Sequence, residues 1–172
     1  ISLTPYHMMK RILVQFCEVI LIILMVFVAT SAIFGGIQFI LDPSGSLLRL
    51  PPELLDNSPF RNYLVPGILL ILFLGLLPLL SALGLIFRPE WRWAESLNIY
   101  ENRHFSWTYS LYSAILLLTW ITAELQFTGH RQFFQTLYSS VGILLLILLL
   151  LPAVMDYYRT PAKPKKGRWR KL

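Results

Sequence analysis

The sequence is poor in charged residues and holds almost no cysteine. Charged residues make up 14% of the 172 residues, whereas an ordinary soluble domain has roughly 25%. A soluble domain of 56% hydrophobic residues could not cover its apolar surface with so few charges, which excludes that class. Cys17 is the single cysteine, so an internal disulfide and a cysteine-built metal site are excluded. Disordered and collagen-like chains have other compositions, and an integral membrane protein of one domain remains.

Four stretches are apolar and long enough to cross a bilayer as helices, which takes about 20 residues. They cover residues 11–41, 62–87, 105–127 and 135–158 of a domain that runs over residues 1–158. A transmembrane β-barrel would instead need segments of about ten residues that alternate in polarity. The run from Ile143 to Leu151 does not alternate. The sequence therefore predicts an all-α fold, a four-helix transmembrane bundle.

The first stretch is longer than a bilayer requires. Its apolar run also exceeds the 7–15 residues of a signal-peptide core, so we expect no cleavage there. A straight helix over residues 11–41 must tilt, loosen at Gly35 and Gly36, or project beyond the membrane.

The distribution of Lys and Arg predicts the orientation of the four spans. Twelve Lys and Arg lie at or before the start of the first span, between the second and third, and after the fourth, whereas three lie on the opposite side. Because cytoplasmic loops are enriched in Lys and Arg, we expect the N- and C-termini in the cytoplasm.

The connection between the first two spans does not have the composition of a plain linker. It opens with Asp42-Pro43-Ser44-Gly45, a turn sequence, and continues with leucines too few to span a membrane. We predict a structured extracytoplasmic loop that packs on the rim of the bundle. Two roles stay open for it: a lid that closes the bundle, or a segment that gates a substrate or docks a partner.

Cationic side chains gather in two segments on the predicted cytoplasmic side. One is the connection between the second and third spans, and the other is a basic tail over residues 159–172 that contains no acid. We expect these side chains to contact anionic lipid headgroups or a partner protein. Nucleic-acid binding is not expected, because no accompanying fold supports it. The candidates are Arg88, Arg92, Arg103, Lys163, Lys165, Lys166, Arg168, Arg170 and Lys171.

Acidic residues within or beside the spans are candidates for function, because a charge in the hydrocarbon region is costly. Glu18 lies roughly 10 Å inside the first span by helical rise. Glu124 lies near the outer end of the third span, and Asp156 lies at the inner end of the fourth. We take Glu18 and Glu124 as a candidate intramembrane polar site. For Glu18 two interpretations stay open: a side chain that snorkels or forms an interhelical hydrogen bond, and a proton-linked or ligand-binding role.

Motifs for catalysis or metal binding are absent from the sequence. It contains no GxSxG, HExxH, P-loop or GxGxxG pattern, so we expect no enzyme and no cofactor. His7, His104 and His130 lie outside the apolar cores, and we expect no metal site in the bundle. An interfacial histidine that binds a pigment or metal with the help of a partner chain stays open.

Small residues predict how the helices pack. Ser106, Ser110 and Ser113 recur at helical spacing in the third span, where such a stripe lets another helix approach closely. The run from Ile143 to Leu151 lacks small residues, and we expect it to face lipid.

Several short motifs carry a family resemblance. They are DPSGSLL, SPFRNYLVPG, W-x-x-x-L in the third span and Q-x-L-Y-x-x-x-G before LLP, within residues 35–158. With these motifs the chain resembles a set of small, uncharacterised bacterial four-helix integral membrane proteins. The resemblance implies a bacterial inner-membrane protein, and it implies no activity and no site residues. Glu18 alone is similar to the acid of small multidrug transporters, whose pattern the long loop and the tail do not follow.

Two functions agree with these features. The first is a non-enzymatic accessory or scaffold subunit of a larger membrane assembly, which would bind other membrane protein subunits. The second is a small transporter or lipid-binding membrane protein that uses Glu18. Both would sit in a bilayer with anionic headgroups.

Overall fold

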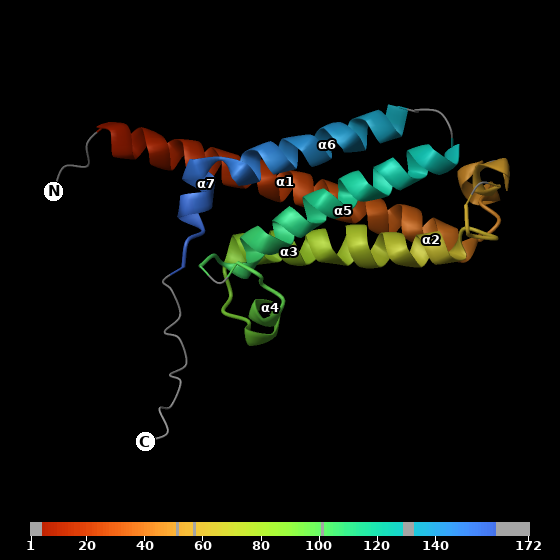
Figure 1. The fold of residues 1–172 in the computed structure, drawn as a ribbon, viewed down its shortest axis with the longest axis horizontal. Coiled ribbons are helices and arrows are strands. Elements are labelled where there is room, and N and C mark those ends of the chain that lie inside the picture. Colours follow the sequence, from red (N-terminus) through yellow and green to blue (C-terminus); the bar gives the residue numbers. More distant parts are fainter. Residues whose placement is uncertain (1–4, 51, 57, 101, 129–132, 161–172) are drawn as a thin grey trace, which may run out of the picture.

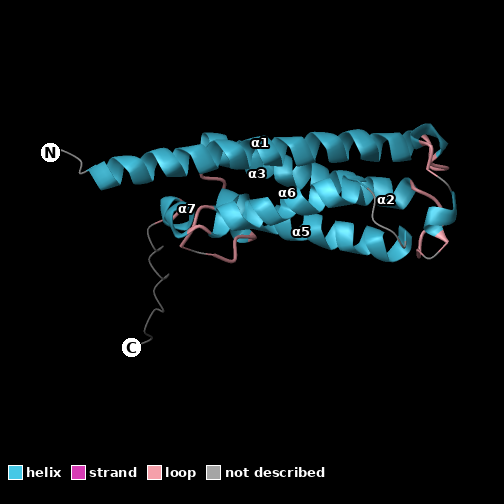
Figure 2. Ribbon diagram, turned by 90° about the horizontal axis from the view of Figure 1, so that it is seen from above, coloured by secondary structure: helices cyan, strands magenta, loops and turns pink. Residues whose placement is uncertain are grey.

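The structure, a computed structural model, describes residues 5–50, 52–56, 58–100, 102–128 and 133–160. Within these residues helices are connected by turns and loops, and the only other pairing is one isolated bridge between Arg103 and Arg159 (Figures 1 and 2). The elements are α1 (Pro5–Leu41), the 3-10 turns η1 (Ser46–Leu48) and η2 (Pro52–Leu55), α2 (Leu64–Leu69), the π-helix η3 (Leu70–Leu76), α3 (Leu77–Phe87), α4 (Arg92–Ser96), α5 (Phe105–Thr128), α6 (Phe133–Leu150) and α7 (Pro152–Tyr157).

Four helical stretches are long and apolar enough to cross a membrane. They are Met8–Leu41, Leu64–Phe87, Phe105–Phe127 and Phe133–Leu150. The predicted all-α class, with four such helices, is therefore confirmed for the described part of the chain.

The long helices lie side by side, so their ends gather in two places (Figures 1 and 2). The start of α1 lies at one end together with α4 and α7, and we call it the terminal end. Residues 42–63, which contain η1 and η2, lie at the opposite end, which we call the loop end. At the terminal end α1 projects beyond the other helices, and it continues without a break through Gly35 and Gly36. The helix therefore does not loosen at the glycines, and part of its extra length extends past the other helices.

Gly36 and Gly67 let α1 and α2 approach closely at the loop end. A Cβ atom on Gly36 would lie 2.7 Å from the carbonyl oxygen of Gly67 and 2.5 Å from Cγ1 of Ile71. A Cβ on Gly67 would lie 2.6 Å from the Cβ of Phe39. Both positions therefore require glycine for the observed helix packing.

The second membrane-length stretch changes from an α-helix to a π-helix and back to an α-helix. Leu70–Leu76 forms a π-helix directly before Pro78, which is buried in the first turn of α3. Proline has no N–H, so an α-helix would leave the carbonyl of Leu74 without its donor. The wider turn before Pro78 accommodates this missing hydrogen bond without interrupting the helix.

The serine stripe of α5 packs against α3 inside the chain. Ser106, Ser110 and Ser113 are each at most 1% exposed. The Ser113 hydroxyl lies 3.4 Å from that of Ser81, and a Cβ on Gly84 would lie 2.8 Å from the Cβ of Ser106. The small residues thus serve contacts between helices of one chain, as a stripe of this kind predicts.

The fourth stretch differs from the single span expected over residues 135–158. Helix α6 ends at Leu150, Leu151 adopts ψ 126°, and Pro152 begins α7 in a new direction. The break frees backbone carbonyls near the end of α6, because proline brings no N–H. The indole N–H of Trp107 donates to the carbonyl of Leu149 at 3.0 Å and satisfies one of them.

Candidate functional site

The segment after α1 is folded around one carboxylate. Asp42 accepts hydrogen bonds from the hydroxyls of Ser44 and Ser46, both at 2.6 Å, and from the backbone N–H of Leu47 at 2.7 Å. These donors, the two serines first, hold the pKa of Asp42 well below its usual range. Asp42 thereby fixes the start of the loop against the end of α1.

Tyr63 joins the two ends of this loop. Its backbone N–H donates to the carbonyl of Pro43 at 2.9 Å, and its ring stacks on Phe39 of α1 at 5.0 Å between centroids. Gly45 has φ 79°, and a Cβ there would lie 2.6 Å from the Tyr63 ring. Glycine is therefore needed at position 45 for two reasons, the left-handed backbone and the space for Tyr63.

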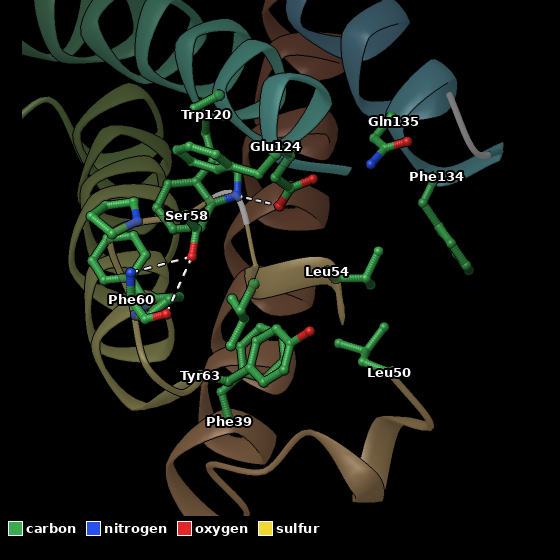
Figure 3. A pocket seen from close by; sticks show the side chains of 15 residues that line it. Phe39, Leu50, Leu54, Ser58, Phe60, Tyr63, Trp120, Glu124, Phe134 and Gln135 are labelled. Atoms are coloured by element: carbon green, nitrogen blue, oxygen red, sulfur yellow. Dashed lines mark hydrogen bonds between the residues drawn. The ribbon is translucent and has the colours of Figure 1, made fainter. Parts of the chain in front are cut away.

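Beneath this loop lies an apolar cavity of about 480 Å³, which we call the loop cavity (Figure 3). Its volume falls in the range of roughly 300–1,000 Å³ that is usual for small-molecule sites. The loop supplies one wall, and α1, α2, α5 and α6 supply the others. The lining residues are Phe39, Leu50, Leu54, Leu55, Ser58, Pro59, Phe60, Tyr63, Pro66, Trp120, Ala123, Glu124, Phe127, Phe134 and Gln135.

A second cavity, of about 400 Å³, adjoins the first and extends into the bundle; we call it the bundle cavity. Phe39, Trp120, Glu124 and Phe134 line both cavities. The bundle cavity reaches Val28, which lies eleven residues before Phe39 in α1, or roughly 16 Å by helical rise. The two cavities thus follow one another from the loop to the interior of the bundle, with four lining residues in common.

Glu124 lies where the two cavities meet. Its Oε1 accepts the indole N–H of Trp120 at 2.5 Å, and it also interacts with the side chain of Gln135 from the first turn of α6. Figure 3 shows its carboxylate between these two residues. An acid, a ring and an amide from two helices thus form the polar part of an otherwise apolar wall.

Comparison with family models, with curated proteins and with solved structures gave no match. The geometry of the chain therefore carries the functional argument by itself.

The other candidate acid, Glu18, lies at the terminal end and is already bonded. Its Oε1 accepts from Nη2 of Arg88 at 2.7 Å and from the hydroxyl of Tyr158, also at 2.7 Å. The Arg88 guanidinium lies over the rings of Tyr157 and Tyr158, at 4.3 and 5.1 Å from their centroids. Glu18 thus connects α1 with the residue after α3 and the residue after α7.

The contact with Glu18 shifts the pKa values of both its partners. Burial lowers the pKa of Arg88, but the hydrogen bond and the charge of Glu18 outweigh it, and the pKa of Arg88 is raised. Burial, followed by the hydrogen bond to Glu18, raises the pKa of Tyr158. Arg88 therefore stays a cation and Tyr158 a neutral donor, which suits a structural role.

We expect Glu18 and Arg88 to contribute jointly to stability. A double-mutant cycle with Glu18→Gln and Arg88→Gln should give a coupling of about 0.5–1.5 kcal/mol, because Glu18 is 16% and Arg88 39% exposed. SDS-induced unfolding in mixed micelles measures it. The matched control is the pair Lys10–Asp156, whose charged atoms lie 3.8 Å apart on more exposed side chains. A Glu18–Arg88 coupling no larger than that of the control would contradict the joint role.

The predicted headgroup-contact arginines do not share one site. Arg88 pairs with Glu18, whereas the guanidinium of Arg103 donates to the carbonyl of Met155 and lies over the ring of Trp107. Arg92 is exposed on α4. Lys163, Lys165, Lys166, Arg168, Arg170 and Lys171 lie outside the described residues.

His104 is engaged within the chain. Its Nδ1 accepts from the backbone N–H of Ser106, which fixes Nε2 as the donor to the carbonyl of Pro89 at 3.2 Å. Burial lowers the pKa of His104, so the neutral ring caps the start of α5. Within the described ranges, no group of three His, Cys, Asp or Glu is placed to hold a metal ion. The side chain of His7 and all of His130 lie outside the described part.

Several residues of the cavities were not among the predicted site residues. Trp120 and Gln135 contact Glu124, and Phe39 and Tyr63 form the wall under the loop. One signal for them was present: Trp120 and Glu124 are four residues apart, which places them on one face of a helix. Tyr158, in contrast, follows Glu18 by 140 residues, and no local pattern connects them.

Proposed function

We propose that the four long helices form a transmembrane bundle with the terminal end in the cytoplasm. Their length and apolar composition support the membrane location. The bias of Lys and Arg in the sequence toward the segments before α1, between α3 and α5, and after α6 supports the orientation. Trp91, Trp93 and Tyr157 lie at that end, where amphipathic rings suit the membrane interface. Residues 42–63 would then form a structured extracytoplasmic loop.

We infer that the protein binds a lipid or another amphiphile with an apolar chain in the loop and bundle cavities. The observation that carries this proposal is a pair of apolar cavities that share Phe39, Trp120, Glu124 and Phe134 in their lining, one of them under the loop. An apolar pocket with few convergent polar groups is the usual form of a ligand site. The elongated shape fits a chain better than a compact ligand.

This proposal keeps the lipid-binding alternative from the sequence but moves its centre from Glu18 to Glu124. Glu18 has two short hydrogen bonds within the chain, and it lines neither cavity. Glu124 lines both. We therefore assign a structural role to Glu18 and a ligand-binding role to Glu124.

We propose a binding function without catalysis. Among the described residues that line either cavity there is one acid and no His, Lys, Arg or Cys. A serine such as Ser58 or Ser31 would need an adjacent base to act as a nucleophile. The lining thus supports holding or passing a ligand.

A cavity-filling substitution tests the proposal. Ser31 lines the bundle cavity, whereas its neighbour Thr30 lines neither, and both hydroxyls bond to carbonyls of their own helix. We expect Ser31→Phe to reduce the amount of co-purified lipid at least about fivefold, since it fills the space of the chain. Thr30→Phe should leave it unchanged. Native mass spectrometry of gently solubilised protein measures both.

The same measurement addresses the accessory-subunit function, which the basic tail over residues 159–172 favours. Equal lipid occupancy in wild type, Ser31→Phe and Thr30→Phe would contradict a ligand in the bundle cavity. A reproducible mass of other protein chains, without lipid in the cavity, would support a non-enzymatic accessory or scaffold subunit instead.

A further inference from the structure

The charge in the described lining of the two cavities is of one sign, negative. Glu124 is the only charged residue among the described residues that line either of them. An anionic headgroup placed beside the Glu124 carboxylate would be repelled, because like charges repel each other strongly where the dielectric constant is low. A cationic headgroup would be attracted to this carboxylate.

The carboxylate of Glu124 is also positioned to accept a further hydrogen bond. A carboxylate has about four acceptor positions. The contacts with Trp120 and Gln135 orient Glu124 at the junction of the cavities, since they come from two different helices. Its side chain is partly exposed to the cavity space. A donor on a ligand would add a hydrogen bond to those that already orient this carboxylate.

Aromatic rings surround the same junction. Phe39, Trp120 and Phe134 line both cavities, and Phe60 and Tyr63 line the loop cavity. The face of an aromatic ring attracts a cation within about 6 Å of its centroid. The rings and the carboxylate thus favour the same kind of headgroup.

The position along the bundle fits a headgroup at Glu124 with its chain below. Glu124 lies four residues before the end of α5, close to the loop end. The bundle cavity continues from there past Leu117 and Leu74 to Val28. A chain in this cavity would lie among the helices while its headgroup stays near the membrane surface.

We propose that the cavities take an amphiphile that combines an apolar chain with a protonated amine, and that Glu124 accepts the N–H of this amine. This inference rests on the proposed function, since it names the ligand class of the same cavities. Two sources share this chemistry: an aminophospholipid of the membrane and a free long-chain amine.

Three chain-matched ligands test the inference on the full-length protein in phosphatidylcholine nanodiscs, whose own headgroup has no N–H to donate. They are palmitylamine, palmityl alcohol and palmitate, and native mass spectrometry gives the occupancy of each. We expect wild-type protein to bind the amine at least about tenfold more tightly than palmitate, with the alcohol between them, as a charge-assisted hydrogen bond allows. Glu124→Gln should remove the preference for the amine and retain the alcohol, whose binding shows that the variant is folded.

Each negative outcome of the binding experiment contradicts a different claim. Equal binding of the three ligands by wild type would overturn the amine inference and leave chain binding intact. Binding of none of them would overturn the proposed function as well. An amine preference that persists in Glu124→Gln would overturn the role of this carboxylate.

A further arm distinguishes the two sources of amine. The palmitylamine titration is repeated in nanodiscs that contain phosphatidylethanolamine in place of part of the phosphatidylcholine. Reduced palmitylamine occupancy there would support the proposal with the membrane aminophospholipid as the ligand. Unchanged occupancy would support it with a free long-chain amine.

Discussion

Gly36→Val is expected to destabilise the protein by about 3 kcal/mol or more, because the added atoms overlap a backbone carbonyl. The new Cβ would lie 2.7 Å from the Gly67 oxygen and 2.5 Å from Cγ1 of Ile71. A flexible side chain could move away, but the Gly67 oxygen belongs to α2 and moves only with the helix. The variant must therefore separate α1 from α2 at the wall of the cavities. The free energy of unfolding in SDS-containing micelles measures the effect.

The neighbouring glycine provides the control for this substitution. A Cβ on Gly35 would lie 3.5 Å from Cδ2 of Leu70, which is an ordinary contact. Gly35→Ala should therefore change the stability by less than about 1 kcal/mol. Similar losses for Gly36→Val and Gly35→Ala would show that the close approach of α1 and α2 does not determine the effect.

Trp107→Ala is the second substitution with a large expected effect, a loss of about 3–5 kcal/mol. Trp107 is 1% exposed, and its removal leaves a cavity within the core. It also leaves the Leu149 carbonyl without its donor at the break between α6 and α7. Because water does not reach this carbonyl readily, the lost hydrogen bond adds to the cost of the cavity.

Two further variants separate these contributions. Trp107→Phe keeps most of the ring volume and removes the N–H, so it should cost about 1–2 kcal/mol. Trp93 is 57% exposed, and Trp93→Ala should cost less than about 1 kcal/mol. The same SDS titration applies, and a Trp107→Ala loss equal to that of Trp93→Ala would contradict the role of Trp107.

The sequence predicted the helical class and the serine stripe because both depend on local composition and spacing. Four apolar stretches and the recurrence of Ser106, Ser110 and Ser113 are visible without knowledge of other helices. The expectation that the leucine run of α6 faces lipid was wrong in part. Leu145 and Leu149 are 0% exposed because one face of α6 packs on the core. A uniform run of leucines cannot show which of its faces is buried, since lipid and core are equally apolar.

Of the candidate site, only the acidic residues could be predicted from the sequence. Glu18 and Glu124 are recognisable as acids in apolar stretches, but the different roles that we propose for them depend on partners from other elements. Arg88 lies 70 residues after Glu18, and the cavity around Glu124 arises from the packing of the loop against α1, α5 and α6. Distances between elements of this kind are set by the whole fold, and no local pattern carries them.

The contact between Glu18, Arg88 and Tyr158 joins residues that are synthesised at widely separated times. Arg88 is made 70 residues after Glu18, and Tyr158 is made 140 residues after it. At translation rates of about 5–20 residues per second, the 70- and 140-residue separations correspond to delays of roughly 4–14 s and 7–28 s. The first span therefore leaves the ribosome with an acid whose final partners do not yet exist. During the first interval the carboxylate has neither partner, and during the second only Arg88 is present, so this contact can be completed only near the end of synthesis.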